Sequence, residues 1–168
     1  MVGYLLDTNV LSFWFDSARV EHEAVIQRIE ALSDHPLLAV SAITFGEIAY
    51  GYRSLGRSYD EDREAEHFGF LEDRIDLILD VNKNTRFYYG ELRASLFEKY
   101  APRSRRKKVK RPEQLVDPET SLQLGIQEND LWLAAQALEH NLVLVTHDVL
   151  DRLRTVAKEL RVEDWAAR

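Results

Sequence analysis

Residues 3–9 read GYLLDTN, a short apolar run that gives way at once to Asp7, Thr8 and Asn9. Such a run with a polar break predicts a buried strand and a turn, and the apolar residues at 10–14 then predict the start of a helix. Asp7 is therefore expected at the end of a buried strand, where a carboxylate loses much of its hydration. An acid in that setting indicates a functional site.

Strands and helices alternate along the remaining chain. Apolar runs at 37–40, 77–81 and 142–145 predict three more buried strands, and residues 160–162 an edge strand. Helical spacing of apolar residues predicts helices at 20–32, 41–52, 59–74, 85–100 and 130–141, with a short one from about residue 149. Ser41 and Asn129 are the expected N-caps of two of these helices.

This alternation predicts an α/β fold, namely one three-layer domain over residues 1–168 with a mainly parallel central sheet flanked by helices. A length of 168 residues suits a single compact domain. Residues 101–118 hold three prolines and a basic run, and are expected to form an exposed loop insertion with little regular structure.

Four carboxylates, those of Asp7, Glu47, Asp130 and Asp148, lie where apolar runs break. Because parallel sheets place functional sites beyond the carboxyl ends of their strands, we expect Asp7 and Asp148 to meet there. Glu47 and Asp130 can reach the same place from helices. Converging carboxylates repel one another unless protons or cations intervene, so we expect Mg²⁺ or Mn²⁺ to be held by Asp7, Asp130 and Asp148.

The remaining site residues have less definite roles. Glu47 either completes the ligand set or positions an attacking water. Asp151 competes with Asp148, which is favoured because it follows its strand directly. His147 has no ligand spacing with the other histidines and is expected beside the site without holding a metal. The residues expected to orient the carboxylates by hydrogen bonds are Thr8, Asn9, Ser41 and Thr146.

Composition narrows the chemistry. The chain has no cysteine, which excludes disulfides, thiolate zinc ligands and a cysteine nucleophile. It offers no convincing Ser/His/Asp arrangement either. No apolar run approaches the roughly 20 residues that span a bilayer, and the chain start lacks a signal-peptide pattern, so a soluble cytoplasmic protein is expected.

The charge is distributed unevenly. The net charge is −7, but residues 103–111 alone contribute +7 and the rest of the chain carries −14. A basic run of this density is a candidate for holding RNA phosphates, while a solvated loop or a contact with a protein partner remain alternatives. Its cationic residues are Arg103, Arg105, Arg106, Lys107, Lys108, Lys110 and Arg111.

Four stretches also carry a family resemblance: LLDTNVL (5–11), SAITFGEI (41–48), NDLWLAA (129–135) and LVTHD (144–148). In this order they resemble the successive motifs of PIN-domain nucleases, and the ending LRVEDW (160–165) resembles the tail of the VapC-type toxins within that family. One such motif is unspecific, whereas four in order cover nearly the whole chain. The residues that match the family's acidic quartet are Asp7, Glu47, Asp130 and Asp148.

The resemblance implies a metal-dependent endoribonuclease that cuts tRNA, rRNA or mRNA, uses Mg²⁺ or Mn²⁺, and often forms homodimers. It further implies that an antitoxin, usually encoded alongside, binds and inhibits the enzyme. A PIN-type RNA-processing nuclease outside any toxin pair would have the same motifs. Segments 59–74 and 101–118 look longer than a minimal member needs, which bears on substrate choice.

Two further classes fit less well. A haloacid-dehalogenase-like phosphatase also has an acid after its first strand, but it needs a second acid two residues later, where this chain has Asn9. A non-catalytic interaction module with a nuclease-like fold would be marked by a missing acid, and all four acids are present.

Overall fold

A computed structural model describes residues 2–32, 36–101 and 109–167. Its centre is a five-stranded sheet in the order β3-β2-β1-β4-β5, and every pair of neighbouring strands is parallel. The predicted α/β fold with a mainly parallel sheet is therefore confirmed. The strands are β1 (Gly3–Leu6), β2 (Leu37–Ser41), β3 (Leu77–Leu79), β4 (Val143–Val145) and β5 (Val162–Glu163).

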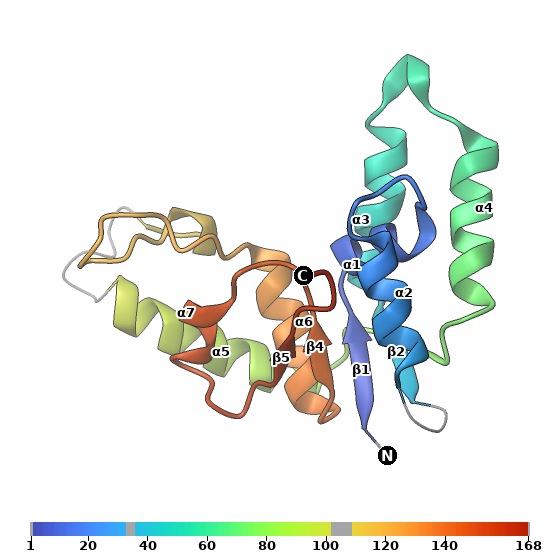
Figure 1. Ribbon diagram of the computed structural model, residues 1–168. Helices are drawn as coiled ribbons and strands as arrows, with labels where there is room; N and C mark the ends of the chain where they lie inside the picture. The colour runs from blue at the N-terminus through green and yellow to red at the C-terminus, as the bar shows by residue number, and fades with distance from the viewer. Residues whose placement is uncertain (1, 33–35, 102–108, 168) are drawn as a thin grey trace.

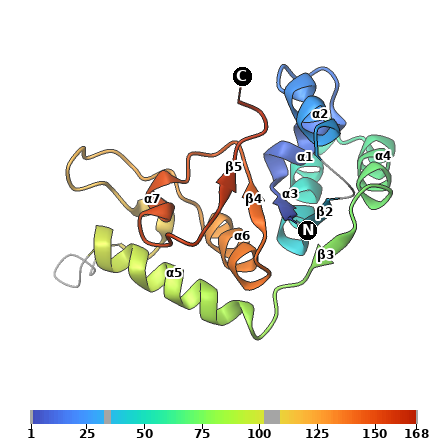
Figure 2. The same ribbon diagram turned by 60° about the horizontal axis from the view of Figure 1, so that its bottom comes forward.

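Helices cover both faces of this sheet, as Figures 1 and 2 show: α1 to α4 lie on one side and α5 to α7 on the other. None of the helices in the described ranges is long and apolar enough to cross a membrane. The helices are α1 (Thr8–Phe15), α2 (His22–Glu30), α3 (Ala42–Arg53), α4 (Glu61–Glu72), α5 (Thr85–Tyr100), α6 (Glu128–Glu139) and α7 (Asp151–Arg154), with 3₁₀ turns η1 (Gly56–Ser58) and η2 (Pro112–Gln114).

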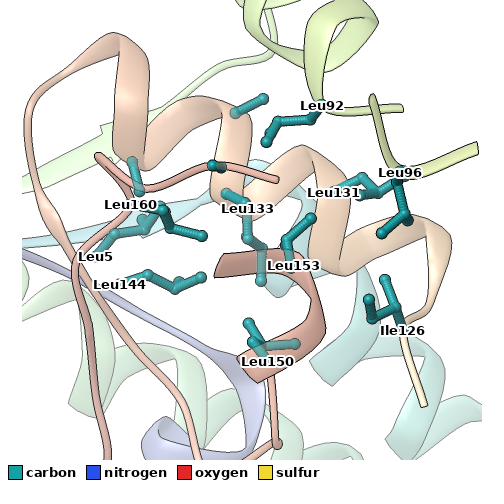
Figure 3. Packing of buried hydrophobic residues seen from close by; sticks show 14 of the residues in the cluster. Leu5, Leu92, Leu96, Ile126, Leu131, Leu133, Leu144, Leu150, Leu153 and Leu160 are labelled. Atoms are coloured by element: carbon teal, nitrogen blue, oxygen red, sulfur yellow. The ribbon is translucent and has the colours of Figure 1, made fainter. Parts of the chain in front are cut away.

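The three layers follow from the alternation of side chains along each strand. Leu5 of β1 and Leu144 of β4 pack with leucines of α5, α6 and α7, a cluster seen from close by in Figure 3. The neighbours of Leu5, which are Tyr4 and Leu6, point the other way and join a second cluster with α1 to α4. Because both faces are covered, β1 is an almost continuous apolar run.

Several local expectations were wrong. Residues 112–117 are partly buried and not an exposed excursion: Leu115 is only 1% exposed because it packs into the core cluster of α5 and α6. Helix α6 has its N-cap at Gln127 and not at Asn129. Helix α7 begins at Asp151, later than the expected residue 149, and the edge strand β5 lies slightly beyond residues 160–162.

The topology of the sheet indicates where a ligand can bind. Strand β1 leads to β2 on one side and is paired with β4 on the other, so the strand order reverses between β1 and β4. Ligands of open parallel sheets bind at such a reversal, beyond the carboxyl ends of the strands. In Figure 1 this is the upper edge of the sheet, where α1 begins directly after β1 and α6 begins nearby.

Candidate active site

Asp7 lies at the carboxyl end of β1 and is held from three sides. Its Oδ1 accepts a hydrogen bond from the Thr8 backbone N–H at 2.6 Å, which makes it the N-cap of α1. Its Oδ2 accepts from the Thr146 hydroxyl at 2.7 Å. Its own N–H donates to the Val145 carbonyl at 2.9 Å, continuing the ladder between β1 and β4. A side chain that is only 5% exposed is thus fixed in direction.

Asp130 and Asp148 bring their carboxylates to Asp7. One oxygen from each of the three residues lies within 4.8 Å of the other two. Asp130 sits in the first turn of α6, is buried, and accepts from the Gln127 N–H at 2.6 Å. Asp148 follows β4 and is exposed. Asp151, the competing acid, begins α7 and lies outside this cluster.

Glu47 lies in the second turn of α3, beside the cluster and not within it. Its Oε2 accepts from the Thr8 hydroxyl at 2.5 Å, and its Oε1 accepts from the Asn129 side-chain amide at 2.7 Å. This contact was not expected from the sequence, in which Asn129 precedes an apolar helical pattern and was predicted to be a helix N-cap. Its position next to Asp130 in the stretch NDLWLAA was the available signal.

Asn9 and Thr146 connect Asp148 to Asp7. The Asn9 amide donates to Asp148 Oδ2 at 3.1 Å, while its Oδ1 accepts from the His147 N–H at 3.1 Å. The Thr146 hydroxyl donates to Asp7 and accepts from the Asp148 N–H at 3.1 Å. The exposed carboxylate of Asp148 is therefore tied to the buried one through two polar side chains.

Ser41 ends β2 and His147 follows β4, and their side chains have different partners. The Ser41 hydroxyl oxygen accepts from the Ile43 N–H at 3.1 Å, so Ser41 is the N-cap of α3 as expected. Within the described ranges it makes no hydrogen bond to a carboxylate. The His147 ring lies 3.0 Å from Asp164 through Nδ1, which directs this side chain toward the C-terminal segment.

The pKa values of the two buried carboxylates are raised well above their ordinary value. Burial is the main cause that raises the pKa of Asp7 to about 6 and the pKa of Asp130 to about 7, from an ordinary value of 3.8. Hydrogen bonds to each carboxylate lower these pKa values, but less than burial raises them. The neighbouring carboxylates add repulsion that raises both pKa values further.

This donor set fits a hard divalent cation. Mg²⁺ and Mn²⁺ prefer oxygen ligands, and the cluster offers three carboxylates whose charges repel one another. A positive charge among them would offset both the burial and the repulsion that raise the two pKa values. A cleft of about 400 Å³ between α1, α3 and α4 adjoins the site at Thr8 and Glu47.

The predicted RNA-binding run is only partly within the described structure. Lys110 and Arg111 are exposed and lie just before η2. The other five cationic residues of the run, at positions 103 to 108, fall outside the described residues.

The fold and the site together define the class of this protein. It is a parallel α/β domain with a carboxylate cluster where the strand order reverses. The family model described as PIN domain matches residues 4–159. The chain belongs to the PIN domain family.

Individual relatives span nearly its full length. The chain is 25% identical over 162 residues to "Ribonuclease VapC2" of Rickettsia felis and 27% identical over 162 residues to "Ribonuclease VapC1" of Haemophilus influenzae. Each alignment covers 96% of this chain and 97% of the relative. A solved structure of VapBC2 from Rickettsia felis, bound to a DNA fragment from their promoter, has the same fold, with a TM-score of 0.68, 24% identity, and coverage of 98% of this chain and 99% of that one.

We predict that Asp130→Asn stabilises the metal-free protein. Between pH 3.8 and about 7 the folded protein holds more protons at Asp130 than the unfolded chain, so its stability falls as pH rises through that window. An amide removes this penalty and still accepts from Gln127. In excess chelator at pH 8, calorimetry should find that the variant has a Tm about 2–4 °C higher than the wild type. A shift of this size corresponds to a gain of about 1 kcal/mol in the free energy of unfolding for a domain of this length. At pH 5 the difference in Tm should be smaller.

The exposed Asp73 at the end of α4 supplies the matched control, since Asp73→Asn is expected to change stability by less than about 0.5 kcal/mol. An unchanged or lower Tm for Asp130→Asn at pH 8 would show that burial of this carboxylate costs the fold nothing.

Proposed function

We propose that this protein is a metal-dependent endoribonuclease that hydrolyses RNA phosphodiester bonds, with Mg²⁺ or Mn²⁺ held by Asp7, Asp130 and Asp148. The observation that carries the proposal is the convergence of three carboxylate oxygens within 4.8 Å at the reversal of the strand order. Membership of the PIN domain family and the ribonuclease names of its relatives give further support.

The protein's own side chains have distinct tasks in this proposal. Bound Mg²⁺ or Mn²⁺ would promote ionisation of the attacking water and offset charge on the phosphate oxygens. Asp7 and Asp130 hold fixed, buried ligand oxygens, because backbone N–H groups and the Thr146 hydroxyl fix their directions. Asp148 completes the set from the exposed side, where the Asn9 amide holds it. Thr8, Asn9 and Thr146 are thus positioning residues.

Glu47 fits the water-positioning role better than the ligand role. Both of its oxygens already accept hydrogen bonds, from Thr8 and Asn129, and it stands beside the three-carboxylate cluster. A carboxylate has about four lone-pair sites, so each oxygen of Glu47 retains capacity for a water. Held in this way, it can orient an attacking water and accept its proton.

Replacing Asp7 with Asn should abolish metal-dependent RNA cleavage, because one buried ligand charge is lost while the N-capping oxygen is kept. We expect kcat to fall by at least about 100-fold, as for loss of an essential catalytic group. The measurement is cleavage of tRNA and rRNA with Mg²⁺ or Mn²⁺ against a chelator control. Full activity in the variant, with circular dichroism matching wild type, would sink the assignment.

Glu47→Gln separates the two roles left open for this residue. If Glu47 positions water, the variant should lower kcat by about 100-fold while Mn²⁺ affinity, measured by calorimetry, changes little. Asp130→Asn is the matched comparison, and it should weaken Mn²⁺ binding strongly. A comparable loss of Mn²⁺ affinity in Glu47→Gln would place Glu47 among the ligands instead.

We further propose that the enzyme is the toxin of a toxin–antitoxin pair, acts in the cytoplasm on cellular RNA, and is inhibited by a cognate antitoxin protein. The resemblance of its motifs and C-terminal segment to VapC-type toxins supports this, as do the VapC names of relatives matched over nearly their full length. A processing nuclease outside any such pair is the alternative. The homodimer implied by the resemblance stays a prediction.

The toxin proposal predicts that a small neighbouring reading frame encodes a protein that co-purifies with this chain and suppresses its ribonuclease activity. Expression of the chain alone should arrest growth, and expression of Asp7→Asn should not, because arrest would need RNA cleavage. Active enzyme that is tolerated without a partner would favour the processing nuclease.

A further inference from the structure

An ion pair joins α5 to the first turn of α6. Arg93 of α5 places Nη1 2.5 Å from both carboxylate oxygens of Glu128, the first residue of α6. The Tyr89 hydroxyl contacts both partners, and the Tyr89 ring stacks on Trp132 with centroids 3.7 Å apart. The Arg93 and Glu128 side chains are 30% and 35% exposed, so this pair is partly shielded from solvent.

The same two residues also hold the end of the basic run. Arg93 Nη2 donates to the Lys110 carbonyl at 2.9 Å, and the Glu128 N–H donates to Glu113 Oε1 at 2.8 Å. Gln114 Oε1 accepts from the N–H groups of Lys110 and Arg111, at 2.9 and 3.0 Å. The backbone that carries these two cations is therefore fastened to the start of α6.

This attachment point belongs to the same helical turn as the site. Glu128, Asn129 and Asp130 are consecutive: Asn129 donates to Glu47, and Asp130 lies in the carboxylate cluster. Figure 1 shows that the segment between α5 and α6 lies beside α5 and reaches the upper edge of the sheet only where α6 begins. The Lys110 and Arg111 side chains are exposed, and neither forms an ion pair within the described ranges.

The charges of Lys110 and Arg111 can reduce the repulsion between this acidic chain and RNA. Without the run at 103–111 the chain carries −14, and its site is built from carboxylates, so an RNA polyanion is repelled where it must be cut. Fixed cations near the start of α6 would offset part of that repulsion and bind phosphates.

We propose that Arg93 and Glu128 are positioning residues that hold Lys110 and Arg111 near the start of α6, where these two side chains bind phosphates of the RNA that enters the carboxylate site. The proposal rests on the ribonuclease function proposed above. Lys110 and Arg111 contact substrate, whereas Arg93 and Glu128 act through them.

Glu128→Gln provides a test with an unambiguous sign. The variant removes a negative charge near the site, so charge alone would strengthen RNA binding. Loss of the attachment would weaken binding instead, because the amide cannot hold Arg93 as the carboxylate does. In an Asp7→Asn background, fluorescence anisotropy with a short labelled single-stranded RNA across KCl concentrations measures both affinity and its salt slope.

We expect Glu128→Gln to weaken RNA binding and to reduce the salt slope toward the value of the Lys110→Gln, Arg111→Gln double variant. That double variant should reduce the slope by about 1.4, because each phosphate contact with a single strand contributes about 0.7. Adding Glu128→Gln to it should cause little further loss, since residues that act through one another are not additive. With Asp7 intact, Glu128→Gln should raise KM more than it lowers kcat.

Glu139→Gln is the matched control. Glu139 ends the same helix and also joins α5, through the Thr85 hydroxyl at 2.6 Å, but at the end remote from the site. Glu139→Gln should leave the RNA affinity and the salt slope equal to those of the Asp7→Asn protein without this change. RNA binding by Glu128→Gln that is equal to or tighter than the parent would overturn the proposal, whereas failure of the wild-type chain to cleave RNA would overturn the proposed function instead.

Discussion

Burial of two carboxylates beside a third is the constraint on which the candidate site depends. The strand order reverses between β1 and β4, and that reversal forces whatever follows the two strands into one place. Here acids follow both. Asp7 and Asp130 are buried, and their pKa values are raised to about 6 and about 7 although each accepts hydrogen bonds. Local donors are therefore insufficient, and the remaining electrostatic cost is what a bound cation would offset.

The hydrogen bonds that hold the acids also build the fold. Asp7 is the N-cap of α1, and Asp130 reaches back to the N–H at the N-cap of α6, as in one half of a capping box. Capping explains one oxygen of each residue. It does not explain why both carboxylates converge with Asp148, which caps neither of these helices. The capping contacts fix the directions of the site carboxylates, so helix formation and site geometry depend on the same bonds.

What the sequence predicted well was local. Strand β1 at Gly3–Leu6 and helix α5 at Thr85–Tyr100 were expected with the observed bounds, because each is indicated by one contiguous stretch of sequence. The acids were expected together because each lies next to such a signal. The contact between Asn129 and Glu47 joins residues 82 positions apart: the place of Asn129 next to Asp130 indicates a site residue, but no local pattern identifies Glu47 as its partner. Burial of Leu115 was missed for the same reason: proline and charge near it favoured a loop, but tertiary packing placed it in the core.

The first turn of α6 shows how metal binding, water positioning and substrate binding are linked in the proposed enzyme. Three consecutive residues face three different partners: Glu128 pairs with Arg93, Asn129 donates to Glu47, and Asp130 joins the cluster. A rotation of this turn would disturb all three contacts at once. The apolar residues of α6 oppose such a rotation, since Leu131 and Leu133 are fully buried against the sheet and α5. The precision of the polar edge therefore depends on the packing of the apolar face directly beneath it.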